Sequence, residues 1–340
     1  MRTLTILLLQ RGLYAILTLL AVSVVIFVGT DLLPGDVAQV ILGQTATPEA
    51  VAALRRELGL DRPAAQRYLE WIGGAVRGDF GKSLANQLPI AVLVGDRLGR
   101  TMALAAAAAV VAIPLSLGLG ILAALHRDRA LDRVISSVTL AIVAFPEFLI
   151  GYLLVVVFAV QLGWLPALSH LRGDADLLQW LRAIALPATC LALVLLAHTM
   201  RLTRTAIVNV LSSDYIQMAE VKGVAPARVI VWHAFPNAIG PILSIVMLMF
   251  AYLVVGVVVV EVVFNYAGMG KLMVDAVSNR DMPLVQACSL IFSVVYVVCN
   301  FLADFLAIAA NPHIAFVIDM HTMVGLRPFI ALTRPTPSAQ

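Results

Sequence analysis

Long apolar stretches alternate with polar segments along the chain, and six of these stretches are long enough to cross a membrane. A helix needs about 20 apolar residues to cross a hydrocarbon core of about 30 Å. We expect the spans at residues 10–31, 101–125, 134–161, 185–207, 239–261 and 285–310. The pattern predicts an all-α membrane protein with six transmembrane helices.

The longest polar interruption, residues 32–100, lies between the first two spans and has helical patterns of its own. Thr47 and the proline after it are typical of a helix start, so we expect a helix over residues 50–58. Gly59 then ends this helix, and residues 64–76 form a second expected helix. The sequence therefore predicts a small helical subdomain rather than a linker.

These elements divide the chain into four regions. The first apolar stretch is longer than the apolar core of a secretory signal, so we expect it to stay as a transmembrane helix. The regions are 1–31 with the first span, the subdomain 32–100, a five-helix core 101–310 that includes a polar loop at 208–238, and a tail at 311–340.

Composition agrees with a membrane protein. Hydrophobic residues make up 61% of the chain and charged residues 13%, and the mean hydropathy is +0.96. These values exclude an ordinary soluble globular protein, and lipid is the expected surrounding. The net charge is only +3 and no basic run is present, so we expect no nucleic-acid partner. The three cysteines all lie in apolar spans, where we expect small buried side chains rather than disulfides or metal ligands.

Lysine and arginine in the short loops predict the orientation, because positive charge collects on the cytoplasmic side. With the N-terminus inside, eleven such residues are cytoplasmic and four are outside. The cytoplasmic set is Arg2, Arg11, Arg127, Arg129, Arg133, Arg201, Arg204, Lys222, Arg228, Arg327 and Arg334, and the outer set is Arg172, Arg182, Lys271 and Arg280. We therefore expect both termini, and the 208–238 loop, in the cytoplasm.

Three glycine-rich segments imitate nucleotide-binding motifs. Gly81-Lys82-Ser83 resembles the end of a P-loop, but Val76 stands where that motif needs a glycine. A later glycine–lysine pair is followed by Leu272, where Ser or Thr would have to contact magnesium. Gly118 and Gly120 lie inside an expected span, where small residues favour close helix packing. We expect a non-catalytic chain that binds no nucleotide, metal or other cofactor itself.

The polar segment 214–237 separates the fourth and fifth expected spans. A cap at Ser212-Ser213-Asp214 precedes an expected helix over 215–222, and Gly223 supplies the permissive backbone of its end. Pro226 suits the start of a second short helix that runs to Pro236. Two short helices joined at a glycine indicate a docking surface parallel to the membrane. A hairpin that merely lies in the membrane interface is the alternative.

This segment resembles the EAA loop of ABC importer permeases, in which a proline lies thirteen residues after a glycine, as Pro236 follows Gly223. Of the small-residue triplet in that loop, only Ala219 fits. From about residue 8 to 314, the chain resembles the first of the two permease subunits of dipeptide, oligopeptide and nickel importers. The matching motifs are Leu33-Pro34-Gly35-Asp36, residues 54–61, Gly78–Ser83, Tyr215, Ala219, Lys222-Gly223, His233-Ala234, Asn237, Glu261–Phe264, Gly268–Gly270 and Asn279-Arg280-Asp281.

The resemblance implies a type I ABC importer fold and a set of partners. These are a second, similar permease subunit, two cytoplasmic ATPase subunits that bind ATP and magnesium, and an extracytoplasmic substrate-binding protein. It also implies that the loop docks on the ATPases. The expected ATPase-coupling residues are Asp214, Tyr215, Ala219, Glu220, Lys222, Gly223, Arg228, His233, Pro236 and Asn237.

The chain departs from the family pattern at Ala267, where a proline is usual, and at Asn311-Pro312-His313, where an acidic residue, proline and arginine are usual. These departures leave the turn near Ala267 and the role of the tail open.

Four polar residues in or beside the expected spans are candidates for the transport pathway or a gate. A carboxylate at the centre of a span costs about 2.5–3.5 kcal/mol unless it faces water or a partner. Glu147 either lines the pathway, where it would contact an amine or cation, or bonds to a neighbouring helix. Glu261 could close an outer gate or pair with Arg280. Asn300 and Asp304 share a helix face, and both pathway and structural roles stay open for them.

The function implied is the permease subunit of an ATP-driven importer for peptides in a bacterial cytoplasmic membrane. The same importer type carries nickel chelates or glutathione, which are the alternative cargoes. A self-sufficient channel or secondary transporter would leave the docking segment unexplained. An intramembrane enzyme would need a His/Glu or Ser/His site at bilayer depth, and Glu147 alone does not supply one.

Overall fold

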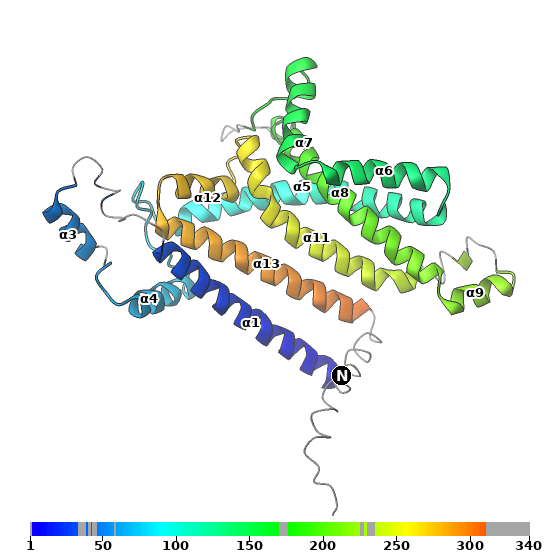
Figure 1. Ribbon diagram of the computed structural model, residues 1–340, viewed down its shortest axis with the longest axis horizontal. Coiled ribbons are helices and arrows are strands. Elements are labelled where there is room, and N and C mark those ends of the chain that lie inside the picture. Colours follow the sequence, from blue (N-terminus) through cyan, green and yellow to red (C-terminus); the bar gives the residue numbers. More distant parts are fainter. Residues whose placement is uncertain are drawn as a thin grey trace, which may run out of the picture.

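The computed structural model describes residues 2–32, 39, 42, 46–57, 59–169, 176–224, 228–229 and 235–310. The described part is almost entirely helical, as Figure 1 shows, which confirms the predicted fold class. Its elements are α1 (Arg2–Asp31), α3 (Pro48–Glu57), α4 (Ala64–Val76), α5 (Ile90–Leu125), α6 (Ala130–Ala144), α7 (Glu147–Leu154), the π-helix η2 (Val155–Gln161), α8 (Leu177–Leu211), α9 (Asp214–Val221), α11 (Phe235–Val263), α12 (Met269–Ser278) and α13 (Met282–Ala310). The expected tail, 311–340, lies outside the described residues.

Four of these helices are long and apolar enough to cross a membrane on their own. They contain Leu8–Asp31, Ile90–Leu125, Leu177–Leu211 and Met282–Leu306. Two bent pairs bring the described residues to as many as six spans, which is the predicted number. The second span begins earlier than expected, since α5 starts at Ile90 and not near residue 101.

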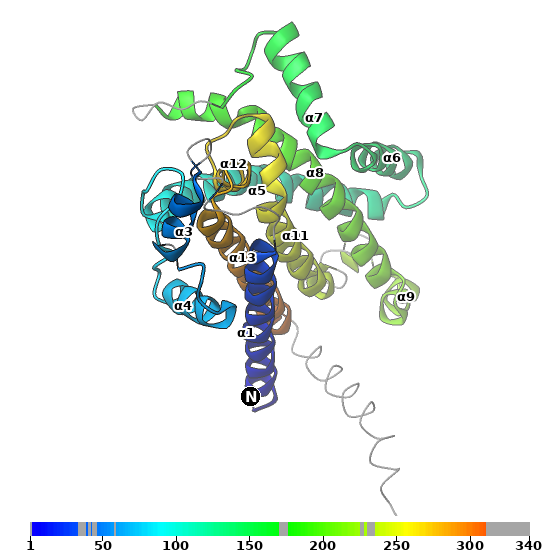
Figure 2. The same ribbon diagram turned by 60° about the vertical axis from the view of Figure 1, so that its left-hand side comes forward.

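The third expected span, 134–161, is not one helix. Phe145 has an extended backbone, as a residue before proline prefers, and it separates α6 from α7. The two halves meet at 100°, and in both views α7 points away from the line of α6 (Figures 1 and 2). A second, milder bend of 45° divides Ile242–Val254 from Gly256–Val263 within α11.

Helix α5 packs closely on α8 through small side chains. Ala105, Ala108 and Ala112 are fully buried in the core that the two helices share with α11, α12 and α13. A Cβ atom added at Gly120 would lie 2.8 Å from Cβ of Thr203 on α8, so the two backbones approach too closely for a side chain there. This confirms the predicted packing role of Gly120. An added Cβ at Gly118 would meet no atom of the described residues within 4 Å.

The subdomain helix α4 rests on the end of α1. Phe27 is buried against the rings of Tyr68 and Trp71, with a centroid distance of 5.5 Å to Tyr68. Arg67 forms an ion pair with Asp31 at 2.8 Å. Helix α4 has the expected range, and α3 starts at Pro48, two residues before the expected range. Both helices lie at the opposite end of the helix assembly from α9 (Figure 1). We refer to these two poles as the α4 end and the α9 end.

Candidate docking surface and membrane site

The connection between α8 and α11, residues 212–234, begins with α9 folded back on the end of α8. Ile216 of α9 is completely buried, and with Val229 it packs against Val210 and Leu211. Because this small apolar cluster fixes α9 to α8, a force on α9 reaches a continuous helix of 35 residues. The expected helix before Gly223 is therefore confirmed.

The outward side of α9 is exposed and partly apolar. Met218 and Val221 have exposed fractions of 56% and 83%, and Asp214 and Lys222 beside them are exposed as well. Gly223 then ends the helix with a φ of +77°, a conformation that favours glycine. Arg228 is also exposed. Exposed apolar side chains bordered by charge are typical of a docking surface.

Two details at the ends of this connection, a cap and a helix start, differ from the sequence expectation. Ser213 does not use its hydroxyl as expected, since it donates to the carbonyl of Val210 in the last turn of α8. Helix α11 starts at Phe235, so Pro236 and Asn237 belong to its first turn and not to a second short helix. Among the expected coupling residues, His233 lies outside the described residues, as do the side chains of Tyr215, Ala219, Glu220, Pro236 and Asn237.

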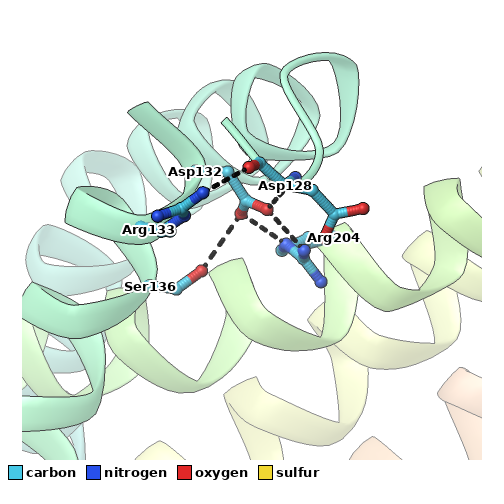
Figure 3. Close-up of a pocket in the computed structure, with 5 residues that line it drawn as sticks. All are labelled: Asp128, Asp132, Arg133, Ser136 and Arg204. Carbon is cyan, nitrogen blue, oxygen red and sulfur yellow. Dashed lines mark hydrogen bonds and ion pairs between the residues drawn. The ribbon is translucent and has the colours of Figure 1, made fainter. Parts of the chain in front are cut away.

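An ion pair joins α6 to α8 near the α9 end. The guanidinium of Arg204 donates to both carboxylate oxygens of Asp132, with Nε to Oδ1 at 2.7 Å and Nη2 to Oδ2 at 2.6 Å. Ser136 and the backbone amide of Asp128 donate to the same carboxylate (Figure 3). The pair lies beside a cavity of about 440 Å³, and Asp132 is only 3% exposed.

This pair was not predicted from the sequence. A bidentate pair between a planar guanidinium and a carboxylate is geometrically specific, so it holds the start of α6 at a fixed place on α8. The chain therefore connects α9, through α8, to the broken span that contains α7.

Glu147 lies at that break and faces a slot between α7, α8 and α11. The slot is lined by three polar residues, Glu147, His198 and Tyr252, and by Leu191, Val194, Leu195, Met249, Leu253 and Gly256. No described residue donates a hydrogen bond to the Glu147 carboxylate or forms an ion pair with it. The sequence left two interpretations of Glu147 open, a pathway-lining role and a bond to a neighbouring helix. No described residue of a neighbouring helix makes that bond.

Glu261, by contrast, is fully buried near the α4 end and hydrogen-bonded. Its Oε1 accepts from the Thr101 hydroxyl at 2.5 Å and its Oε2 from the Lys271 amide at 3.0 Å. Thr101 in turn accepts from the amide of Met269. A Cβ atom added at Gly268 would overlap the Glu261 carboxylate. Glu261 thus anchors the turn into α12.

Tyr266 supports the same turn from the other side. Its hydroxyl donates to the carbonyl of Arg100 at 2.9 Å. Burial, with a smaller contribution from the charge of Glu261, raises the pKa of Tyr266 to about 12, so the phenol keeps the proton that it donates. The α11–α12 turn and the adjacent part of α5 are therefore joined by several buried hydrogen bonds.

The other two pathway candidates have partners on their own or a neighbouring helix. Asp304 pairs with Arg11 of α1 at 2.8 Å, and Asn300 donates to the carbonyl of Tyr296. These contacts correspond to the structural alternative for each residue. Cys190, Cys288 and Cys299 are buried, as expected. Within the described ranges, no group of three His, Cys, Asp or Glu side chains could hold a metal ion.

Comparison with known proteins identifies the family. Residues 116–315 match the family described as binding-protein-dependent transport system inner membrane component. Residues 4–105 match the N-terminal family of the same membrane component. The chain belongs to this family. This permease is therefore a multi-pass component of an inner membrane and the permease subunit of an ABC importer, and it acts together with other transporter subunits.

Curated relatives cover nearly the whole permease. It is 35% identical over 308 residues to a probable peptide ABC transporter permease protein of Sinorhizobium fredii, which covers 91% of this chain and 98% of the relative. It is 38% identical over 307 residues to the glutathione transport system permease protein of Escherichia coli K12, with 90% and 98% covered. The glutathione permease protein of Shigella dysenteriae is similar to the same extent. These matches confirm the resemblance to permeases of the dipeptide, oligopeptide and nickel type.

Proposed function

We propose that this permease forms half of the pathway through which peptides enter the cell. The relatives named for peptide and for glutathione support this cargo, since glutathione is itself a small peptide. Glutathione alone and nickel chelates are the alternatives. A second, homologous permease would form the other half, and an extracytoplasmic binding protein would deliver the cargo.

We also propose that α9 docks on the cytoplasmic ATPases. In this arrangement both termini and the α9 end are cytoplasmic, and the subdomain of α3 and α4 is outside. ATP and magnesium bind to two ATPase subunits, and this chain binds no cofactor and catalyses no reaction. The observation that carries the proposal is the burial of Ile216, because it fixes α9 to α8 while Met218 and Val221 stay exposed.

The mechanism that follows is rigid-body coupling. Closure of the ATPases on ATP would displace α9, and α8 would transmit the displacement because it is one continuous helix. The Asp132–Arg204 pair would carry it to α6, and the break at Phe145 would let α7 change its angle.

The test is reconstitution of the complete transporter in proteoliposomes with ATP enclosed and binding protein added. Uptake of trialanine, glutathione and a nickel–histidine chelate is measured together with ATP hydrolysis. We expect trialanine to be taken up and to stimulate hydrolysis. Uptake of the nickel chelate and of neither peptide would show that the cargo is a nickel chelate. Uptake without ATP would indicate a channel.

A further inference from the structure

The slot at Glu147 is the place where the two bent spans of the permease meet. Glu147 is the first residue of α7, directly after the 100° break, and Gly256 follows the 45° bend of α11. A Cβ atom added at Gly256 would lie 3.9 Å from Oε2 of Glu147, so the carboxylate faces the bend. Irregular backbone at membrane depth is tolerated where it is buried in protein or lines a cavity, and both bends border this slot.

Glu147 differs from the other acidic side chains that we singled out in the spans. Asp132, Glu261 and Asp304 each have a donor on another helix or turn. Glu147 has none among the described residues, and the slot around it is mostly aliphatic. A carboxylate in such surroundings is strongly disfavoured without a cation or hydrogen-bond donor. The slot is therefore complementary to a group that brings positive charge and N–H donors.

The size and rim of the slot restrict that group. Its volume of about 20 Å³ holds one water-sized group, which is also the size of an ammonium group. Tyr252, at 60% exposure, reaches from the slot to the surface, and its ring lies 6.5 Å from that of His198. An aromatic face at the rim favours a passing cation.

We propose that this slot receives the protonated amino group of the transported peptide, with Glu147 as its counter-ion. The inference rests on the proposed peptide cargo and makes the site more specific. The remainder of the peptide would lie outside the slot, beyond Tyr252. Binding would be transient, because a change in the angle of α7 moves Glu147 away from Gly256.

The experiment separates charge from packing at Glu147. Glu147→Gln keeps the shape, Glu147→Asp keeps the charge, and Glu49→Gln is the control, since Glu49 is exposed in the first turn of α3. Each variant is assembled into the complete transporter, and uptake of trialanine and N-acetyl-trialanine is measured. Each uptake is divided by the amount of that peptide bound to the binding protein, determined by equilibrium dialysis.

We expect Glu147→Gln to lower trialanine uptake about tenfold or more, because a hydrogen-bonded ion pair is lost. Uptake of the acetylated peptide, binding-protein-stimulated ATP hydrolysis and the Glu49→Gln variant should be unchanged. Glu147→Asp should retain most of the uptake. Unchanged trialanine uptake by Glu147→Gln, or equal losses for both peptides, would overturn the ammonium site. Failure of the unmodified transporter to take up any peptide would instead reject the peptide cargo.

A second variant tests the slot itself. Gly256→Ala should be tolerated, because the added Cβ makes an ordinary contact with Glu147. Gly256→Leu should fill the slot and lower trialanine uptake as strongly as Glu147→Gln does. Normal uptake by Gly256→Leu would show that cargo does not enter there.

Discussion

The hydroxyl of Ser83 donates to the carboxylate of Asp281 at 2.5 Å, although 198 positions separate the two residues. Both side chains are almost completely buried. Asp281 also accepts from the amides of Ala85 and Leu284, so it caps the start of α13 and holds the loop before α5 at the same time. Ser83 belongs to the segment that imitates a P-loop, and the fold uses it as a structural contact.

Removal of either partner should destabilise the permease at this junction. We expect Ser83→Ala to cost about 1–3 kcal/mol, because it leaves a buried carboxylate short of one donor. Thermal unfolding of the purified permease in detergent measures the change. Ser278→Ala is the matched control, since the exposed Ser278 hydroxyl only donates within its own helix. Equal stability of the two variants would contradict the importance of the contact.

The Asp132–Arg204 pair gives a prediction with a characteristic pattern. Arg204→Met alone should cost about 1–3 kcal/mol, because the Asp132 carboxylate loses its charged partner and keeps only the Ser136 hydroxyl and the Asp128 amide as donors. A double variant with Asp132→Leu should recover much of that loss, since replacing both partners of a buried pair by apolar residues is often neutral. Arg201→Met, an exposed position one turn earlier on α8, serves as the control. Additive losses in the double variant would show that the two residues do not interact.

If the pair also transmits motion, the same double variant will recover its stability but not its transport activity. We expect the recovered protein to hydrolyse ATP while its peptide uptake per ATP falls several-fold, because α6 is no longer held to α8 by a directional contact. Uptake and ATP hydrolysis are measured together in proteoliposomes. Full uptake per ATP would limit the pair to a structural role.

Gly223 allows a test of the docking segment. An added Cβ would meet no atom of the described residues within 4 Å, and the φ of +77° restricts which residues this position accepts. Asn tolerates this conformation and proline cannot adopt it, so Gly223→Asn should function and Gly223→Pro should not. We expect the Gly223→Pro permease to reach the membrane but to be uncoupled, so that ATP hydrolysis continues while uptake is lost. Normal transport by that variant would exclude α9 as the transmitting element.

The two glycines of α5 provide an internal comparison of packing. Gly120→Ala should cost about 1–3 kcal/mol, because its Cβ would overlap Thr203 on α8. Gly118→Ala should be neutral or stabilising by up to about 1 kcal/mol, because its Cβ would meet no atom of the described residues and alanine favours helix. Thermal unfolding of both variants decides. A larger loss at Gly118 would contradict the observed α5–α8 contact.

Much of the architecture could be read from local pattern. The existence of α3, the range of α4, the membrane class and the helix before Gly223 follow from prolines, glycines and apolar length. The start of α5 at Ile90 was missed because the charged residues Asp96, Arg97 and Arg100 interrupt the apolar pattern in its first turns. The break at Phe145 has a signal in the following proline, but its angle depends on what α7 packs against.

The candidate functional residues, too, were only partly predictable from the sequence. Sequence pattern singled out Glu147 as a costly charge in a span, but it left open whether another helix supplied a partner. It also suggested a gate at Glu261, where the structure shows an anchored turn. The pair of Arg204 with Asp132 was not predicted, because nothing in the sequence around Arg204 points to Asp132.

By itself, the sequence determined which segments enter the membrane and which family the permease resembles. Bilayer thickness sets the length of an apolar span, so a span can be found from the sequence. The order of motifs along the chain is likewise visible without knowing which residues are in contact. Only the tertiary structure decided which charges are paired, that Ser83 meets Asp281, and that Glu147 faces the bend at Gly256 without a described donor. Those relationships depend on how helices far apart in the chain pack together, and helix packing is not encoded in any single segment.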